Sequence, residues 1–179
     1  MKTSLCMKKI YPFVVVLTIL LYSCGGEEPK KPRVFEGYPI WMDTVVVSQE
    51  KIIRSVEPGM SVEEVSERET LKPTEGDSLC KYYEFKTDSN YTITFNYRFQ
   101  NKKLDEIEMT IFTEKTESSA EIFNQLLKYY ESRFSKPMEE KGIYVFNATT
   151  SAGNPAKISL EDRSELHKGI VHLLVYSED

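Results

Sequence analysis

The sequence predicts an α+β domain in which two tandem helix-plus-three-strand units form one antiparallel sheet with the helices on one face. Two serine-led capping motifs, Ser61-Val-Glu-Glu64 and Ser118-Ser-Ala-Glu121, predict the start of a helix in each unit. Three segments of alternating apolar and polar residues follow each motif, as expected for strands. A three-stranded sheet with one helix is barely stable alone, so the two units are expected to join.

The first unit covers about residues 48–113. Before its capping motif, Thr44–Val47 is a β-branched run, and Ile52, Ile53 and Val56 then fall at helical spacing until Pro58-Gly59. The helix after Ser61 is expected to end before Pro73. The alternation predicts strands at Lys81–Lys86, Tyr91–Phe99 and Leu104–Phe112, joined by turns at Asp88–Asn90 and Asn101-Lys102.

The second unit covers about residues 117–177. Its helix has an apolar stripe of Phe123, Leu127, Tyr130 and Phe134, and Pro137 lies beyond the expected end. Strands are expected at Ile143–Ala148, Ala156–Glu161 and Gly169–Tyr176. The last strand is apolar on both faces, which predicts either a central strand or one covered by residues 33–47. Because the halves share little identity, both a duplication and an independent similarity of architecture stay open.

The N-terminus has the three parts of a secretory signal. Lys8 and Lys9 precede an apolar run over Ile10–Tyr22, and the small residue Ser23 precedes Cys24. The run has 13 residues, whereas a membrane-spanning helix needs about 20. Residues 1–23 are therefore expected to be a cleaved signal peptide, with translation starting at Met1 or at Met7.

Leu21, Tyr22, Ser23 and Cys24 resemble the lipobox of bacterial lipoproteins. The resemblance implies that Cys24 is the lipid attachment site and the first residue of the mature chain, with the membrane as the first partner. The alternative is an ordinary cleavage that leaves a plain thiol. Residues 24–42 are expected to form a polar tether before a single domain at 43–179.

The tether predicts where the lipoprotein resides. In the lipoproteins that this N-terminus resembles, an Asp directly after the lipidated Cys marks retention at the inner membrane. Gly25 occupies that position in this sequence. The expected location is the outer membrane, with the periplasmic or surface leaflet unresolved. Glu27 and Glu28 resemble acidic surface-export signals, and they are equally consistent with a solvated linker.

Charge and cysteine content restrict the partners. Without residues 1–23, the chain has 20 basic and 28 acidic residues, a net charge of −8. This balance repels phosphate backbones, so no nucleic-acid partner is expected. Cys80 is the one cysteine after Cys24, which leaves no pair for an intramolecular disulfide in the domain; it is expected to be a small apolar filler.

The segment Ile52–Val65 resembles the start of SmpA/OmlA-type small outer-membrane lipoproteins, where an apolar helix leads into Gly-Met-Ser/Thr. Tyr82–Phe85 and Phe99–Leu104 are similar to the later aromatic strand and hairpin, so the resemblance covers Ile52–Met109. It implies a helix-helix-three-strand fold and an accessory role in β-barrel assembly. A duplicated unit also looks like the β-lactamase-inhibitor-protein architecture, whose concave sheet binds another protein. Two departures are the missing Gly before Pro73 and the absence of Gly-Met from the second half.

No catalytic, metal or cofactor site is expected. The sequence lacks a Gly-rich phosphate loop, a Cys-x-x-Cys pair and a nucleophile elbow. His167 falls in a charged turn and is expected to be solvated, while His172 is expected to be an edge or packing residue. Glu106 and Glu108 lie about 7 Å apart on one strand face, which is expected to be a solvated outer face.

Aromatic residues are the candidate contact residues. Tyr82, Tyr97, Phe99 and Tyr176, with Tyr129, exceed what one core needs and are typical of a protein-binding surface. The alternative is that they form cross-strand pairs. The leading hypothesis is therefore an outer-membrane-anchored lipoprotein, not an enzyme, that acts as a protein-binding or envelope-assembly module.

Two other classes of function stay open. The first is a carrier of an apolar lipid or glycan, which needs a pocket above about 300 Å³ between helices and sheet. The second is a hydrolase, which needs a cleft where two of Glu106, Glu108, His167 and His172 converge.

Overall fold

The computed structural model describes residues 35–87 and 91–178, which belong to one compact unit beginning at Arg33. The expected signal peptide, Cys24 and most of the expected tether lie outside the described residues, as does the expected turn at Asp88–Asn90. No helix in the described ranges is long and apolar enough to span a membrane.

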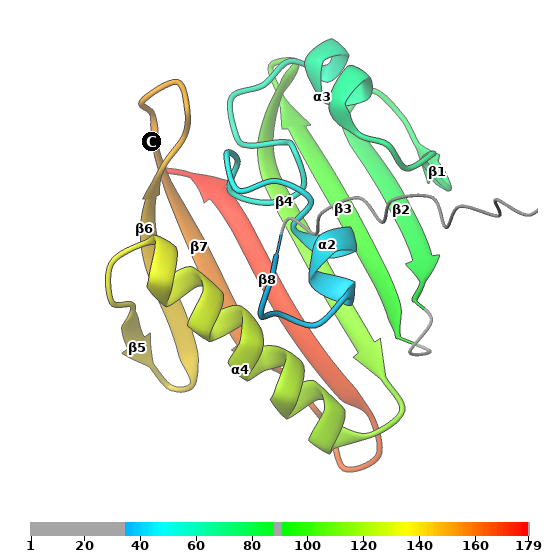
Figure 1. Cartoon of the computed structure of the whole chain (residues 1–179). Coiled ribbons are helices and arrows are strands. Elements are labelled where there is room, and N and C mark those ends of the chain that lie inside the picture. The colour runs from blue at the N-terminus through cyan, green and yellow to red at the C-terminus, as the bar shows by residue number, and fades with distance from the viewer. Residues whose placement is uncertain (1–34, 88–90, 179) are drawn as a thin grey trace, which may run out of the picture. The chain divides into compact units, whose positions relative to one another are not determined.

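An eight-stranded antiparallel sheet forms the body of the unit, in the order β1-β2-β3-β4-β8-β7-β6-β5 (Figure 1). The strands are β1 Glu75–Gly76, β2 Cys80–Lys86, β3 Thr92–Gln100, β4 Lys103–Thr113, β5 Met138–Glu140, β6 Ile143–Thr149, β7 Pro155–Asp162 and β8 Gly169–Ser177. The six longer strands are those that the alternation predicts, with ends shifted by at most one residue. The Asn101-Lys102 turn is confirmed, since both residues have positive φ as a two-residue hairpin turn requires.

The predicted fold class is wrong: the fold is not two tandem helix-plus-three-strand units. The described residues form eight strands, and the helices of the two halves differ in size, with α3 spanning Val62–Arg68 and α4 spanning Thr116–Arg133. The prediction depended on two equivalent capping boxes, and the second box does not form. Helix α4 begins before Ser118, and the Ser119 hydroxyl instead donates to the Thr116 carbonyl at 2.7 Å.

The first capping box is confirmed. The Glu64 amide donates to Ser61 Oγ at 3.1 Å, and the Ser61 amide donates to Glu64 Oε2 at 2.8 Å. The loop before it is hydrogen-bonded to β4, because the Gly59 amide donates to the Leu104 carbonyl at 2.7 Å. These bonds hold α3 at one end of the central strands.

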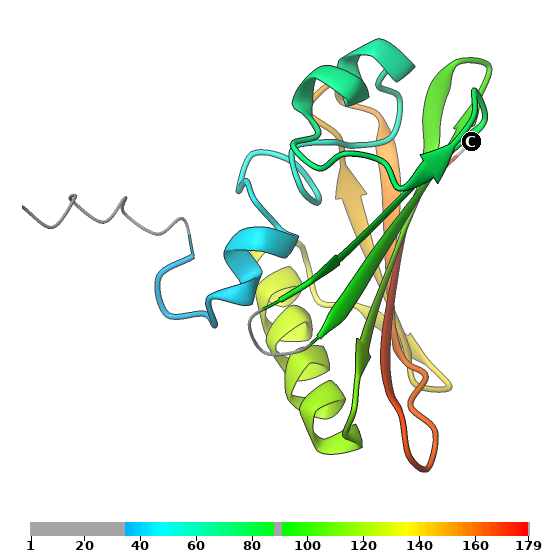
Figure 2. The ribbon, with the colours of Figure 1, turned by 90° about the vertical axis from the view of Figure 1, so that its right-hand side faces the viewer.

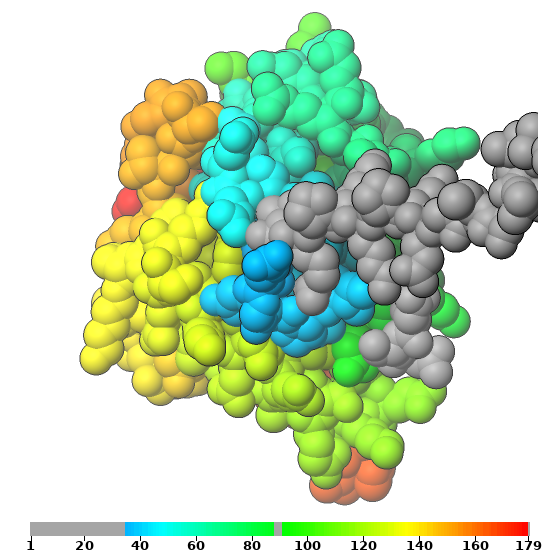
Figure 3. Space-filling model, in the orientation of Figure 1, coloured from blue at the N-terminus to red at the C-terminus, as the bar shows by residue number. Residues whose placement is uncertain are grey.

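The three helices of the described residues lie on the same face of the sheet (Figure 2). Figure 3 shows α4, α3 and the segment around α2 (Trp41–Val45) together on this side. The core lies between these helices and the sheet, and Leu126 and Tyr130 of α4 are fully buried in it. Burying large apolar side chains on a single sheet face supplies most of the stability of such a layer.

Residues 35–42, expected to be tether, belong to the folded unit. Phe35, Trp41 and Met42 are buried in the core, and the Phe35 ring meets the Tyr129 ring edge-on at 5.6 Å. The β-branched residues after them are partly in α2 and not in a strand. Burial against α4 therefore decides the conformation of this segment. The sequence does not indicate this burial, because polar residues separate the apolar ones.

Strand β8 is central, between β4 and β7. Its residues Val171, Leu173 and Val175 are fully buried beneath the helices. This confirms that β8 is a central strand, the first of the two explanations predicted for its apolar residues on both faces. The residues that alternate with them lie on the opposite face of the sheet.

Candidate functional site

The candidate site is the face of the sheet opposite the helices, called the outer face below. Figure 2 shows β8 bowed toward the helices at its middle, so the outer face is concave along the strands. On β8 this face presents Ile170, His172, Leu174 and Tyr176, which alternate with the buried residues. No helix among residues 35–87 and 91–178 lies on this side.

The structure separates the four aromatic residues predicted to form a contact surface. Tyr82 and Tyr176 lie on the outer face and are half-buried. Tyr97 and Phe99 are buried in the core, where the Tyr97 ring lies 5.0 Å from that of Tyr83. The alternative explanation by aromatic cross-strand pairs therefore fits Tyr97, whereas Phe99 is a core residue opposite Leu104. Strand alternation was the available signal, because it places both on the face of Phe95.

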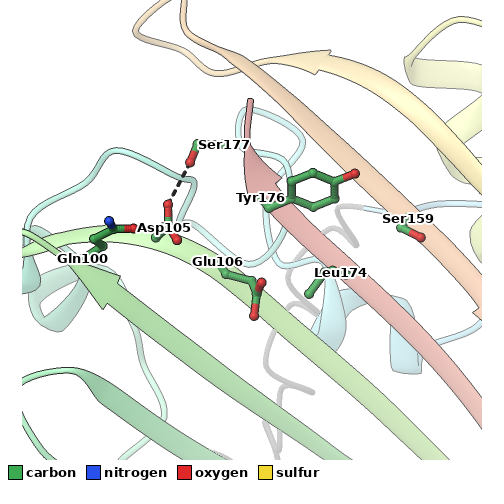
Figure 4. A pocket seen from close by; sticks show the side chains of 7 residues that line it. All are labelled: Gln100, Asp105, Glu106, Ser159, Leu174, Tyr176 and Ser177. Carbon is green, nitrogen blue, oxygen red and sulfur yellow. Dashed lines mark hydrogen bonds between the residues drawn. The ribbon is translucent and has the colours of Figure 1, made fainter. Parts of the chain in front are cut away.

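One end of the outer face has a shallow hollow of about 370 Å³, here called the acidic hollow (Figure 4). Ser177 Oγ donates a 2.9 Å hydrogen bond to Asp105 Oδ1 at its rim. Glu106 forms an ion pair with the exposed guanidinium of Arg98. The residues that line it are Gln100, Asp105, Glu106, Ser159, Leu174, Tyr176 and Ser177.

Negative charge is in excess at the acidic hollow. Burial raises the pKa of Glu106 above its ordinary value, and the negative charges of Glu108 and Asp105 raise it further. The positive charge of Arg98 opposes these effects without outweighing them. A cation placed in this hollow would therefore stabilise the ionised form of Glu106.

The other end of the outer face has a second hollow, of about 540 Å³, here called the basic hollow. Lys168 Nζ lies 4.5 Å from the centroid of the Phe112 ring, a cation–π contact. His167 is exposed here, as the sequence predicts. The residues that line it are Lys86, Thr92, Phe112, Thr113, Glu114, His167 and Lys168.

A histidine–carboxylate pair lies between the two hollows. His172 Nε2 is 2.9 Å from Glu108 Oε1, and the imidazole is only 8% exposed. The hydrolase hypothesis requires two of the candidate side chains to lie within hydrogen-bond distance in a cleft. His172 and Glu108 lie within that distance, but neither lines a hollow. Among the described hydrogen bonds, none joins the imidazole to a hydroxyl or thiol. The pair is therefore best read as a link between β4 and β8.

The geometry supports neither a metal site nor a lipid- or glycan-binding pocket between the helices and the sheet. No group of three or more His, Cys, Asp or Glu within the described ranges is arranged to hold a metal ion. Between α4 and the sheet the space is filled by aromatic side chains, with the rings of Tyr130 and Phe146 5.9 Å apart and both fully buried. Both hollows described above lie outside this layer.

Two buried charged clusters were not predictable from the sequence pattern. Arg54 and Glu69 form a bidentate ion pair beneath the helix layer, and the Tyr97 hydroxyl donates to Glu69 Oε2 at 2.6 Å. Glu57 is buried too, where it accepts from Lys51 Nζ at 2.8 Å and from the Ser151 amide. Charged residues inside the apolar stretch 52–60 were the only available signal. The first cluster joins loops to β3 through Tyr97, and the second joins the loop that contains Lys51 and Glu57 to the turn at Ser151.

No family model, curated protein or solved structure matches this chain. The resemblance of Ile52–Met109 to SmpA/OmlA-type lipoproteins therefore stays a prediction.

Proposed function

We propose that this protein is an outer-membrane lipoprotein, anchored through Cys24, that acts as a non-catalytic protein-binding module through its outer face. The observation that supports it is the set of half-buried apolar and aromatic side chains on the outer face of the central strand β8. Leu174 and Tyr176 lie on the outer face of the central strand β8, at the acidic hollow, instead of being covered by the helices. Apolar side chains grouped on a concave face are typical of contact surfaces.

The arrangement favours a protein partner over chemistry at a small molecule. Both hollows are shallow and lie on an open sheet face, whereas sites for small molecules usually enclose most of the ligand. The helix face has its own role, because α4 and the segment 35–57 cover the core. The outer face is then the surface left for a partner while the lipid holds the chain at the membrane.

The anchor is tested by metabolic labelling with a palmitate analogue. We expect the wild-type protein to be labelled and to sediment with membranes, because acyl chains contribute about 0.8 kcal/mol per buried CH₂. The Cys24→Ala variant should lose both properties. Equal labelling of the two proteins would refute the anchor.

The binding face is tested by photocrosslinking in intact envelopes. A photoreactive residue replaces Tyr176 on the outer face, and in the control protein it replaces Ile40, which is 68% exposed before α2. We expect a discrete protein adduct from position 176 and none from position 40. Adducts from position 40 alone would place the contact on the helix side and refute the proposal.

A further inference from the structure

The two hollows lie at opposite ends of the same pair of strands. Glu106 pairs with Tyr176 at the acidic end, and Phe112 pairs with Ile170 at the basic end. Six residues separate these two rungs on each strand, which corresponds to about 20 Å. Any occupant that reaches both hollows must therefore be elongated along β4 and β8.

An apolar strip joins the hollows. Along β8 the outer-face positions run from Ile170 to Leu174 and Tyr176, and all three side chains are half-buried. Leu174 and Tyr176 form the end of the strip that also lines the acidic hollow. His172 interrupts the strip, but its Nε2 is already hydrogen-bonded to Glu108. The strip therefore offers apolar contact to a partner with little polar surface left to desolvate.

The hollows have opposite charge. Asp105 and Glu106 line one, with Arg98 as the cation in contact with Glu106, whereas Lys86 and Lys168 line the other, with one carboxylate, Glu114. A second copy of this chain is a poor occupant, because two concave faces would meet mainly at their rims. A partner with a narrow, convex element fits the shape and can match both charges.

We propose that the outer face binds an elongated segment of a partner protein, with a lysine or arginine in the acidic hollow, apolar residues over β8 and an acidic residue in the basic hollow. This inference rests on the proposed binding function. A helix that spans the strip needs about 13 residues, so its basic and acidic ends are separated by three to four turns.

Charge reversal at each end tests this inference, with the crosslinking yield from position 176 as the readout. Glu106→Lys and Lys168→Glu should each lower the yield about fivefold or more, and Glu106→Gln should lower it less. The matched controls on the exposed side of α4, Glu121→Lys and Lys128→Glu, should change it less than twofold. Raising salt from about 0.05 M to about 0.5 M should lower the wild-type yield, because salt screens exposed charges. Thermal melts confirm that each variant is folded.

The outcomes separate the two proposals. If Glu106→Lys and Lys168→Glu both give the wild-type crosslinking yield, the inferred charge-matched partner segment is refuted, while the proposed binding face is not. No adduct from position 176 in the wild-type protein overturns the proposed function itself. Recovery of the yield in the Glu106→Lys/Lys168→Glu double variant would identify a second copy of this chain as the occupant, since both partners then change sign together, and would also overturn the inference.

Discussion

Replacing Glu69 by alanine should be among the most destabilising single changes in this fold. Its carboxylate, 2% exposed, accepts hydrogen bonds from Arg54 Nε at 2.7 Å, from the Tyr97 hydroxyl and from the Leu71 amide at 2.8 Å. Arg54 is also buried and is held over the Phe95 ring at 5.1 Å. Removing the carboxylate leaves a buried guanidinium without its counter-ion.

Breaking one side of a buried, hydrogen-bonded ion pair costs about 3–5 kcal/mol. For a unit of this size, a loss of about 4 kcal/mol lowers the melting temperature by about 10 °C. The assay is urea denaturation followed by far-UV circular dichroism. The control for a milder change is Tyr97→Phe, which removes one hydrogen-bond donor and leaves the ion pair. It should lower the free energy of unfolding by about 1 kcal/mol.

The double variant Arg54→Met/Glu69→Leu removes both charges and should recover much of the stability lost in Glu69→Ala, because apolar residues of similar volume often replace buried pairs at little cost. A cost below about 1 kcal/mol for Glu69→Ala would refute the reasoning. So would a double variant less stable than Glu69→Ala, because that would mean the charge left behind is not the source of the loss.

Three further predictions follow from local contacts. Burial opposes ionisation of Glu69 and Glu57, yet their hydrogen bonds and neighbouring cations hold both pKa values below the ordinary 4.5. The contribution of these carboxylates to the free energy of unfolding should therefore be complete above about pH 4.5 and be lost as the pH drops through their folded-state pKa values. Urea titration at several pH values follows this loss, and Glu69→Ala should make the pH dependence flatter. Gly169→Ala should lose about 1–3 kcal/mol, because a Cβ there would overlap Thr113 Oγ1 and lie 2.6 Å from the Lys115 carbonyl oxygen; an unchanged melting temperature would contradict this. Ser61→Ala removes the one confirmed capping box and should cost about 1 kcal/mol in the same assay, whereas Ser118→Ala, at the box that does not form, should cost less.

Long alternating strands and one cap were predictable because their physics is local. Residues 92–100 alternate strictly, so half of their side chains had to face the core, and the Ser61 box involves only four consecutive residues. The two edge strands were not predictable, since Glu75–Gly76 and Met138–Glu140 are too short to show a period. They are held by pairing with β2 and β6, which is a property of the sheet.

The candidate site was predictable only in part. The alternation of β8 correctly separates Leu174 and Tyr176 from the core residues between them. The hollows could not be foreseen, because each combines residues from distant segments, such as Glu106 with Ser159 and Phe112 with His167. The buried pair of Arg54 and Glu69 was hidden for the same reason: 15 residues separate its members, and no periodicity marks them.

The most direct test of the binding face compares two matched substitutions in the anchored protein, Leu174→Asp on the outer face and Ile40→Asp before α2. Both replace an apolar side chain by a carboxylate, and thermal melts establish that both variants fold. The measurement is the amount of crosslinked partner recovered from intact envelopes, with the photoreactive residue at position 176. We expect at least a tenfold loss for Leu174→Asp, about 1.4 kcal/mol, and no change for Ile40→Asp. Equal recovery for the two variants would contradict a binding surface on the outer face.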